Sequence, residues 1–278
     1  ILRFEEVENI ISACAALGVK KVRFTGGEPL IIKGIDKLIK HTASVPGIKD
    51  ISLTTNGMLL AYMAEDLKNA GLKRVNISID TLQEDKFKKI TKLGDIKKVF
   101  DSVEKCLSLD MVPVKLNIVL MRGINDDEIG DFLSLTMDNP IQVRFIELMP
   151  IGEGLNYFES CGMKVEEIIN RYPKLIPIKD DSKVASVYKL PNAKGSVGLI
   201  SPVSCKFCSE CNRIRLTATG MIKPCLHSEE EINLKPYLND EKRLIEVIHN
   251  AVYNKPDEHH LDTEGKSDTG RMMFQIGG

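Results

Sequence analysis

The 278-residue chain is long enough to fold as one barrel-sized domain, or as part of a barrel joined to a smaller domain. Its 43% hydrophobic and 28% charged residues are typical of a globular protein, and its net charge of -1 gives no overall attraction for nucleic acid or a membrane surface. The sequence has no run of about 18 apolar residues and no secretory pattern at its start. We therefore expect a cytoplasmic protein with no nucleic-acid or membrane partner.

The first half of the chain alternates helix-like and strand-like segments. Apolar residues recur at helical spacing over residues 3–17, and Gly18 ends that pattern. We expect further helical stretches over residues 35–44, 59–70, 83–110 and 125–137, and strands over residues 19–24, 50–54, 74–79, 114–120 and 143–148. Short strands separated by helices predict right-handed, parallel βαβ units. The fold class is therefore α/β, an open or incomplete (β/α)6 TIM-type barrel whose sixth strand would precede residue 1.

The pattern changes near residue 161. A helix over residues 165–172 is followed by short strands near 185–190 and 195–200, a cysteine-rich segment, a helix over 240–253 and a polar tail. We therefore expect a partial barrel over residues 1–160 and a C-terminal α+β domain over residues 161–278. His259 and His260 stand in a charged stretch and are interpreted as surface residues.

Polar residues mark the predicted strands of the first half. Several form i, i+2 pairs, which lie on one face of a strand. The set is Lys21, Arg23, Thr54, Asn56, Asn76, Ser78, Asp80, Lys115, Asn117, Arg144 and Glu147. Active sites of parallel α/β folds lie at the carboxyl ends of the strands, and we expect these residues there. The basic members indicate a strongly anionic ligand, since arginine binds phosphate through two parallel hydrogen bonds.

Four of the seven cysteines lie between residues 205 and 225. Cys208 and Cys211 form a C-x2-C pair, and thirteen residues separate Cys211 from Cys225. In a reducing compartment this spacing indicates metal binding rather than disulfides. A closed zinc site would need a fourth ligand, which Cys205 could supply. The alternative is a [4Fe–4S] cluster on three cysteines, with one iron open to another ligand.

Two arginines beside the cysteines favour the open cluster. Arg213 and Arg215 alternate with Ile214 and Leu216, so both guanidinium groups are expected on one side of a strand. Such a pair has no evident role beside a structural zinc ion. Beside an open cluster, it could hold an anionic substrate.

The motifs resemble those of a known family. They are FTGGEPL at residues 24–30, LTTNG at 53–57, NISID at 76–80, RFIELMPIG at 144–152, CNRIRLT at 211–217 with the distal Cys225, and the terminal Gly277–Gly278. In this order they resemble the GTP 3′,8-cyclases (molybdenum cofactor biosynthesis protein A) of the radical S-adenosylmethionine superfamily. The GGEP segment points only to the superfamily, whereas CNRIRLT with the distal cysteine and the diglycine end is specific to the family.

The resemblance implies a (β/α)6 barrel with two [4Fe–4S] clusters. The first cleaves S-adenosylmethionine to a 5′-deoxyadenosyl radical, which takes the 3′ hydrogen of GTP. The C3′ radical then attacks C8 of guanine, giving (8S)-3′,8-cyclo-7,8-dihydroguanosine 5′-triphosphate for molybdenum cofactor biosynthesis. The resemblance also implies a terminal diglycine that threads toward the active site, and family members are often homodimers.

The resemblance also implies roles for individual residues in the matching motifs. S-adenosylmethionine would contact Gly27, Ser78 and Met149, and the Glu28 carboxylate could accept a hydrogen bond from its amino group. GTP would bind Lys21, Arg23, Thr54, Lys115, Arg144 and the stretch Arg213, Ile214 and Arg215, whose arginines we expect to be catalytic. Cys208, Cys211 and Cys225 would hold the second cluster, with Cys205 as a bystander.

One element of the family pattern is absent from the printed sequence. The radical-generating cluster needs a C-x3-C-x2-C loop, which the seven cysteines do not form. Because the first residue is Ile rather than Met, we expect that loop upstream of residue 1. Residues 1–278 alone should then bind GTP and one cluster without generating a radical. Two rival interpretations are a radical enzyme that modifies peptides and a non-catalytic zinc module fused to a barrel remnant.

Overall fold

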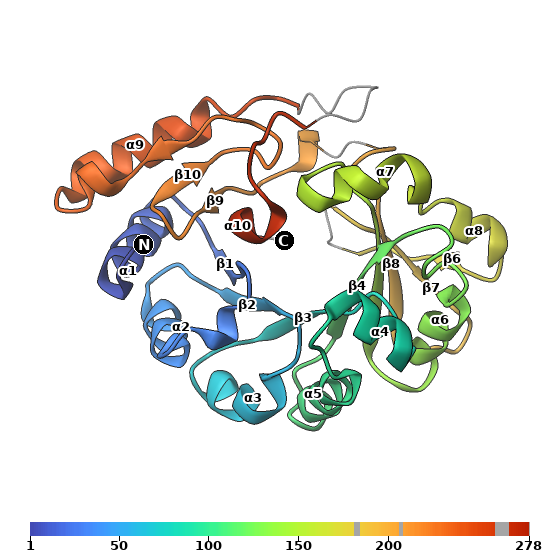
Figure 1. Cartoon of the computed structure of the whole chain (residues 1–278). Coiled ribbons are helices and arrows are strands. Elements are labelled where there is room, and N and C mark those ends of the chain that lie inside the picture. Colours follow the sequence, from blue (N-terminus) through green and yellow to red (C-terminus); the bar gives the residue numbers. More distant parts are fainter. Residues whose placement is uncertain (181–183, 206–207, 259–266, 278) are drawn as a thin grey trace. The chain divides into compact units, whose positions relative to one another are not determined.

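A computed structural model describes residues 1–180, 184–205, 208–258 and 267–277 of the chain (Figure 1). The residues group into two compact units. Unit 1 comprises Ile1–Thr54, Asp66–Lys73 and Asn212–Gly278, and unit 2 comprises Thr55–Glu65 and Arg74–Cys211. The division expected between residues 160 and 161 stays a prediction. In the described ranges, no helix is long and apolar enough to cross a membrane.

Unit 2 is built on paired strands in the order β3-β4-β5-β8-β7-β6. The first four of these strands are mutually parallel, and β7 and β6 extend the sheet in antiparallel fashion. The bounds are β3 Arg74–Ser78, β4 Val114–Leu120, β5 Ile141–Glu147, β6 Ile176–Pro177, β7 Ser186–Lys189 and β8 Ser196–Ile200. The expected α/β class with parallel strands is confirmed, while closure into part of a (β/α)6 barrel stays a prediction.

Helices separate the parallel strands of unit 2 (Figure 1). Their bounds are α4 Glu84–Thr91, α5 Ile96–Ser108, α6 Ile129–Asp138, α7 Leu155–Cys161 and α8 Glu167–Arg171, and α3 (Leu60–Asn69) is shared between the units. The start of α5 has a local cause, because the Asp95 side chain accepts a hydrogen bond from the Lys97 backbone N–H at 3.0 Å. Helix α7 was not expected from the sequence.

The two faces of the parallel strands differ in character. One face is apolar: Ile77, Leu116, Val143 and Val197 are in register across the four strands and are at most 1% exposed. Phe145 lies on the same face of β5, and its ring meets Phe132 of α6 edge-on, with centroids 6.1 Å apart. The apolar face therefore packs against the helices, and alternation places the intervening polar residues on the opposite face.

Unit 1 has its own hydrophobic core. Its elements are α1 Phe4–Ala16, β1 Lys21–Phe24, α2 Ile35–Ser44, β2 Asp50–Thr55, β9 Arg215–Leu216, β10 Met221–Lys223, β11 Ile232–Asn233, α9 Glu241–Tyr253 and α10 Met273–Ile276. Strands β1 and β2 are parallel, and β9, β10 and β11 form a small antiparallel sheet. Helix α1 packs against α9, where Ile10, Leu244 and Ile248 form a buried cluster with Ile222 of β10.

Candidate active site

Two rows of mostly polar residues cross the parallel strands of unit 2, on the face opposite the helices. Residues in register on neighbouring strands share a face, so each row is continuous. The first row is Asn76, Lys115, Gln142 and Ser196, and the second is Ser78, Asn117, Arg144 and Gly198. Lys115 is the second residue of β4, so the expectation that it lies at a carboxyl end is wrong. The two rows therefore lie one after the other along the strands, on the same face of the sheet.

A hydrogen-bond chain fixes the direction of the Arg144 side chain. Its Nε donates to Gln142 Oε1 at 2.8 Å, and Gln142 Nε2 donates to Ser196 Oγ at 3.1 Å. Gly198 gives the arginine room, because a Cβ there would lie 3.2 Å from Arg144 Cγ. The polar face thus carries an oriented cation.

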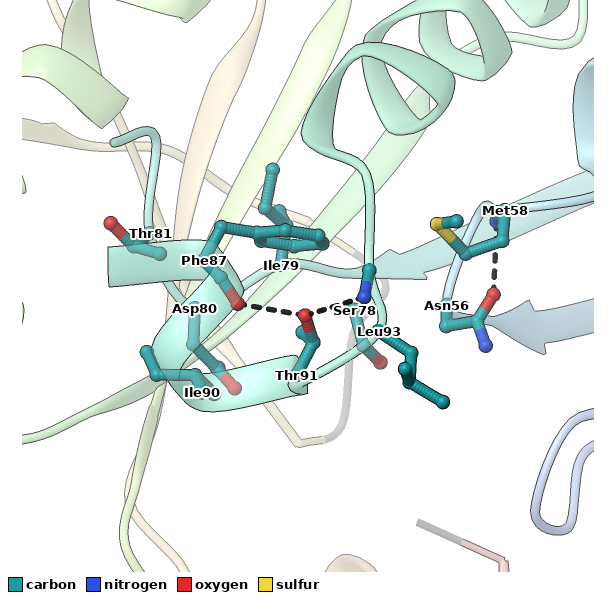
Figure 2. Close-up of a pocket in the computed structure, with 11 residues that line it drawn as sticks. Asn56, Met58, Ser78, Ile79, Asp80, Thr81, Phe87, Ile90, Thr91 and Leu93 are labelled. Carbon is teal, nitrogen blue, oxygen red and sulfur yellow. Dashed lines mark hydrogen bonds between the residues drawn. The ribbon is translucent and has the colours of Figure 1, made fainter. Parts of the chain in front are cut away.

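A pocket opens in unit 2 where β3 ends (Figure 2). Its polar lining includes Asn56, Ser78 and Asp80, while the α4 segment contributes apolar side chains such as Phe87 and Ile90. Ser78 is exposed there, as expected for a ligand-binding residue. The Asn56 side chain is turned toward its own loop and accepts a hydrogen bond from the Met58 N–H at 2.9 Å. The pocket therefore offers a ligand both polar and apolar contacts.

Asp80 contributes a carboxyl group to the lining of this pocket. Its Oδ1 accepts a hydrogen bond from the Val119 N–H at 2.9 Å, and Asn125 Nδ2 donates to its backbone carbonyl at 2.8 Å. Burial raises the pKa of Asp80 to about 6, although the Val119 hydrogen bond opposes the rise. In its ionised form this carboxyl group favours a cationic ligand over an anionic one.

The segment after β5 places Met149 in a tight turn. The Ile151 N–H donates to the Met149 carbonyl at 2.8 Å. A Cβ at position 154 would lie 2.3 Å from that carbonyl oxygen, so only glycine fits there. Met149 itself is partly exposed.

Glu147, the last residue of β5, caps the turn before the cysteine segment. Its side chain is 4% exposed and accepts hydrogen bonds from the Val203 N–H at 3.1 Å, the Ser204 N–H at 2.9 Å and the Ser204 hydroxyl. Ser204 Oγ also lies 3.3 Å from Glu166 Oε2. The sequence grouped Glu147 with ligand-facing residues, whereas the structure uses its carboxylate to fix a loop.

In unit 1, Lys21 and Arg23 lie on one face of β1 and are exposed. The register pairs Arg23 with Ser52 of β2, and Arg23 Nε donates to Ser52 Oγ at 3.3 Å. Thr54, two residues further along β2, shares that face and is 8% exposed. Unit 1 therefore also presents cations on a polar strand face.

The loop after β1 receives the C-terminal tail. Gly26 adopts a φ of 128°, Gly27 is exposed, and a Glu28 carboxylate oxygen accepts a hydrogen bond from the Leu30 N–H at 3.0 Å. A Cβ at Gly277 would lie 2.7 Å from Thr25 Cγ2, so the tail lies directly against this loop. Gly278, His259, His260 and Phe207 lie outside the described residues.

The segment after Cys211 follows the expected alternation on its apolar side. Ile214 and Leu216 pack against the hydrophobic core of unit 1, while the direction of the Arg213 and Arg215 side chains stays a prediction. Lys255 Nζ donates to the Arg213 carbonyl at 2.9 Å, which ties this segment to the residues after α9.

Three cysteines remain as candidate cluster ligands. Cys208, Cys211 and Cys225 are partly exposed and in the reduced, non-disulfide form, and Cys205 is exposed. Cys208 and Cys211 belong to unit 2 and Cys225 to unit 1. Among the described residues, no three Cys, His, Asp or Glu side chains gather to hold a metal ion. The donor chemistry fits an iron–sulfur cluster, while the set of three ligands stays a prediction.

A partly buried ion network flanks Cys225 in unit 1. Lys223 is 1% exposed, and its Nζ lies 2.5 Å from the Ser228 carbonyl and 3.5 Å from Glu231 Oε1. Both oxygens of Glu231 accept hydrogen bonds from the Arg271 guanidinium, which lowers the pKa of Glu231. The start of the tail is thereby held to the segment that follows Cys225.

Two sequence families match the chain in succession. The Radical SAM superfamily matches residues 1–136, and Molybdenum Cofactor Synthesis C matches residues 141–261. A GTP 3′,8-cyclase from Clostridium botulinum strain Hall is 55% identical over 279 residues, which cover 100% of this chain and 88% of the relative. The chain belongs to the GTP 3′,8-cyclase family.

Other GTP 3′,8-cyclases support this membership. The Clostridium acetobutylicum protein is 50% identical over 274 residues, covering 98% of this chain and 86% of the relative. The Heliobacterium modesticaldum protein is 45% identical over 287 residues, covering 100% of this chain and 88% of the relative. The resemblance drawn from the motifs is confirmed.

For this GTP 3′,8-cyclase family member, the structure adds residues that the motifs did not assign. Asp80 and Asn56 join Ser78 in one pocket, and Asn117 lies beside Ser78 in register. The sequence signal for each was its polar character near a predicted strand. Spacing alone could not distinguish a ligand-facing side chain from one engaged in a turn.

Proposed function

We propose that the protein, with its radical-generating cluster in place, has the cyclase activity of its family, the radical S-adenosylmethionine-dependent conversion of GTP to (8S)-3′,8-cyclo-7,8-dihydroguanosine 5′-triphosphate in molybdenum cofactor biosynthesis. The observation that carries this proposal is the 55% identity to a GTP 3′,8-cyclase over the whole of this chain. The polar face of unit 2 supports it, because the interior of a packed barrel is normally filled with apolar side chains.

For S-adenosylmethionine, we assign contacts in each unit. In unit 2 these are Ser78 and Met149; the exposed position of Ser78 in the pocket supports its assignment. In unit 1 they are Gly27 and Glu28. The Gly27 backbone is open to close approach, and the Glu28 carboxylate keeps acceptor capacity beyond its bond to the Leu30 N–H.

For GTP, the proposed contacts are mainly cations, which suit a triphosphate. They are Lys21, Arg23, Thr54, Arg213, Ile214 and Arg215 in unit 1, and Lys115 and Arg144 in unit 2. Because the Ile214 side chain packs against the core, its contact with GTP would use its backbone. Arg213 and Arg215 would be catalytic by holding GTP in position for reaction.

The cluster ligands are proposed from the same motifs. Cys208, Cys211 and Cys225 would hold a second [4Fe–4S] cluster with one iron open to guanine, and Cys205 would take no part. A first [4Fe–4S] cluster, which the radical S-adenosylmethionine superfamily implies, would supply the electron that cleaves S-adenosylmethionine to the radical that removes the 3′ hydrogen. A homodimer and a cytoplasmic location also remain predictions.

The test is turnover by the holoenzyme after anaerobic cluster reconstitution, with GTP, S-adenosylmethionine and a reductant. We expect the cyclised triphosphate, with 5′-deoxyadenosine formed only when GTP is present. Iron and sulfide analysis accompanies the assay. Failure to bind GTP would favour a peptide-modifying enzyme, and zinc without iron or sulfide would favour a structural metal module. Loss of metal in a Cys205→Ala variant would indicate a closed four-cysteine site.

A further inference from the structure

Glu147 occupies a position where the pattern of its strand favours an apolar side chain. Alternation along β5 puts residue 147 on the helix-facing side together with Val143 and Phe145, which are both 0% exposed. The residue in register with it on β4 is Leu120, also 0% exposed. A buried carboxylate in apolar surroundings is costly unless hydrogen bonds compensate for the lost water. The placement of Glu147 therefore indicates a role that depends on its acceptor oxygens.

One short turn supplies the compensating donors. Glu147 accepts hydrogen bonds from the Val203 N–H at 3.1 Å, from the Ser204 N–H at 2.9 Å and from the Ser204 hydroxyl. These donors belong to residues 201–205, called here the 201–205 turn. Four of its five residues are at least partly exposed, so apolar burial contributes little to holding them. Hydrogen bonds therefore fix the turn on the end of β5.

A second carboxylate holds the same turn from another element. Glu166 lies just before α8, and its Oε1 accepts a hydrogen bond from the Ser201 hydroxyl at 2.8 Å, while its Oε2 lies 3.3 Å from Ser204 Oγ. The Cys205 N–H donates to the Ser201 carbonyl at 3.2 Å, which closes the turn. The 201–205 turn is thus attached through its serines to carboxylates from two elements of unit 2.

The 201–205 turn leads directly to two of the proposed cluster ligands. Cys208 follows Ser204 by four residues, so the two Cα atoms can lie at most about 14 Å apart. Cys208 begins the 3-10 turn Cys208–Glu210, and the Cys211 N–H donates to the Cys208 carbonyl at 3.0 Å. Attachment of the turn to β5 therefore limits where both thiolates can lie.

We propose that Glu147 and Glu166 are positioning residues for the second [4Fe–4S] cluster, because they hold the 201–205 turn and thereby place Cys208 and Cys211 for ligation. This role rests on the proposed function and its ligand set. In this role neither glutamate contacts the cluster, GTP or S-adenosylmethionine.

The variants separate positioning from stability. Glu147→Met removes the acceptors but suits the apolar face, so added apolar burial offsets the lost hydrogen bonds. Glu147→Gln keeps one acceptor oxygen. Glu166→Ala removes the acceptor for Ser201 at an exposed residue. Glu167→Ala is the matched control, because Glu167 pairs with Arg122 at 2.8 Å rather than with the turn.

The experiment measures alkylation of each cysteine in the anaerobically reconstituted holoenzyme by mass spectrometry of its peptides, together with the melting temperature of the metal-free protein. Ligation protects a thiolate, because the group that binds the metal is also the group that alkylation attacks. Labelling of the two ligand cysteines, Cys208 and Cys211, therefore reports their release from the cluster. Cys106, which is 0% exposed, reports global unfolding, and the exposed Cys205 is the labelling reference.

In the natural holoenzyme, the two ligand cysteines should react more slowly than in the metal-free protein. We expect Glu147→Met to speed their labelling about tenfold, as loss of hydrogen bonds of this strength does. Labelling of Cys106 should not change, and the melting temperature should stay within about 4 °C of the natural value. Glu166→Ala should speed labelling about threefold, whereas Glu147→Gln and Glu167→Ala should stay within about twofold of the natural rate.

Three results would overturn this positioning role. They are a natural labelling rate in Glu147→Met, an equal acceleration in Glu147→Gln, and an acceleration matched at Cys106, which would indicate general unfolding. If Glu147→Met does not fold, the comparison of Glu166→Ala with Glu167→Ala decides, since positioning requires only the former to label faster. If the natural protein labels the two ligand cysteines equally fast with and without metal, the proposed ligand set itself fails, which is a distinct outcome.

Discussion

Glu147 provides the sharpest test of how the fold holds the segment that leads to the cysteines. Replacing Glu147 with Ala removes the acceptor for the Val203 and Ser204 N–H groups, in a side chain that is only 4% exposed. Both backbone donors would lose their partner. The turn before Cys205 should therefore loosen, and the protein should lose stability.

The size of the loss follows from these contacts. A hydrogen bond typically contributes about 0.5–1.5 kcal/mol, and the full penalty of an unpaired buried donor does not apply here, because Val203 is half-buried and Ser204 is exposed. The Ser204 hydroxyl can keep Glu166 as acceptor, at 3.3 Å, so two donors count rather than three. We expect Glu147→Ala to lower the free energy of unfolding by about 2 kcal/mol. Glu147→Gln keeps one acceptor oxygen and should cost about 1 kcal/mol.

The assay is urea unfolding of the metal-free protein under reducing conditions, followed by circular dichroism, with amide hydrogen exchange of the peptide that contains Val203 and Ser204. Glu159→Ala is the control, because Glu159 is exposed on the same unit and its loss should cost at most about 0.5 kcal/mol. If Glu147→Ala were as stable as this control and exchanged its 203–204 amides at the same rate, the capping role would be refuted.

Three further predictions concern the pocket and the tail. Asp80→Asn should stabilise the metal-free protein by up to about 3 kcal/mol above pH 6, because burial raises the pKa of Asp80 from 3.8 to about 6. In urea unfolding, this gain should vanish near pH 4. A gain that does not depend on pH would contradict the assigned pKa shift. Gly277→Ala should speed protease cleavage of the tail, because the new Cβ would lie 2.7 Å from Thr25 Cγ2. A second substitution, Thr25→Ser, removes that methyl group and should restore part of the protection against cleavage. If it restored none, the contact between residues 277 and 25 would be refuted. Arg271→Met should speed the same cleavage about tenfold by removing the guanidinium that binds Glu231, and Arg271→Lys should give an intermediate rate. Equal cleavage rates in the natural protein and both variants would exclude an anchoring role for Arg271.

The sequence predicted many elements of the fold because their patterns are local. The helix over residues 35–44 and the strand over residues 114–120 match α2 and β4 at both ends. Strand β8 was also expected near residues 195–200, but within a second domain. Its parallel pairing with β5 depends on contacts between residues more than fifty positions apart, and no local period encodes them.

The candidate site was predictable in composition but less so in geometry. Period-two spacing correctly predicted that Ile214 and Leu216 face the core of unit 1. The same spacing could not indicate that the Glu147 carboxylate accepts hydrogen bonds from a turn, since the donors are the distant residues 203 and 204.

The central claim is that the protein removes the 3′ hydrogen of GTP by radical chemistry and closes a ring onto guanine C8. The most direct measurement uses GTP carrying deuterium at C3′, with the reconstituted holoenzyme and S-adenosylmethionine. The account predicts 5′-deoxyadenosine one mass unit heavier than with unlabelled GTP, together with the cyclised nucleotide. Unlabelled 5′-deoxyadenosine, or recovery of GTP with no cyclised nucleotide, would contradict it.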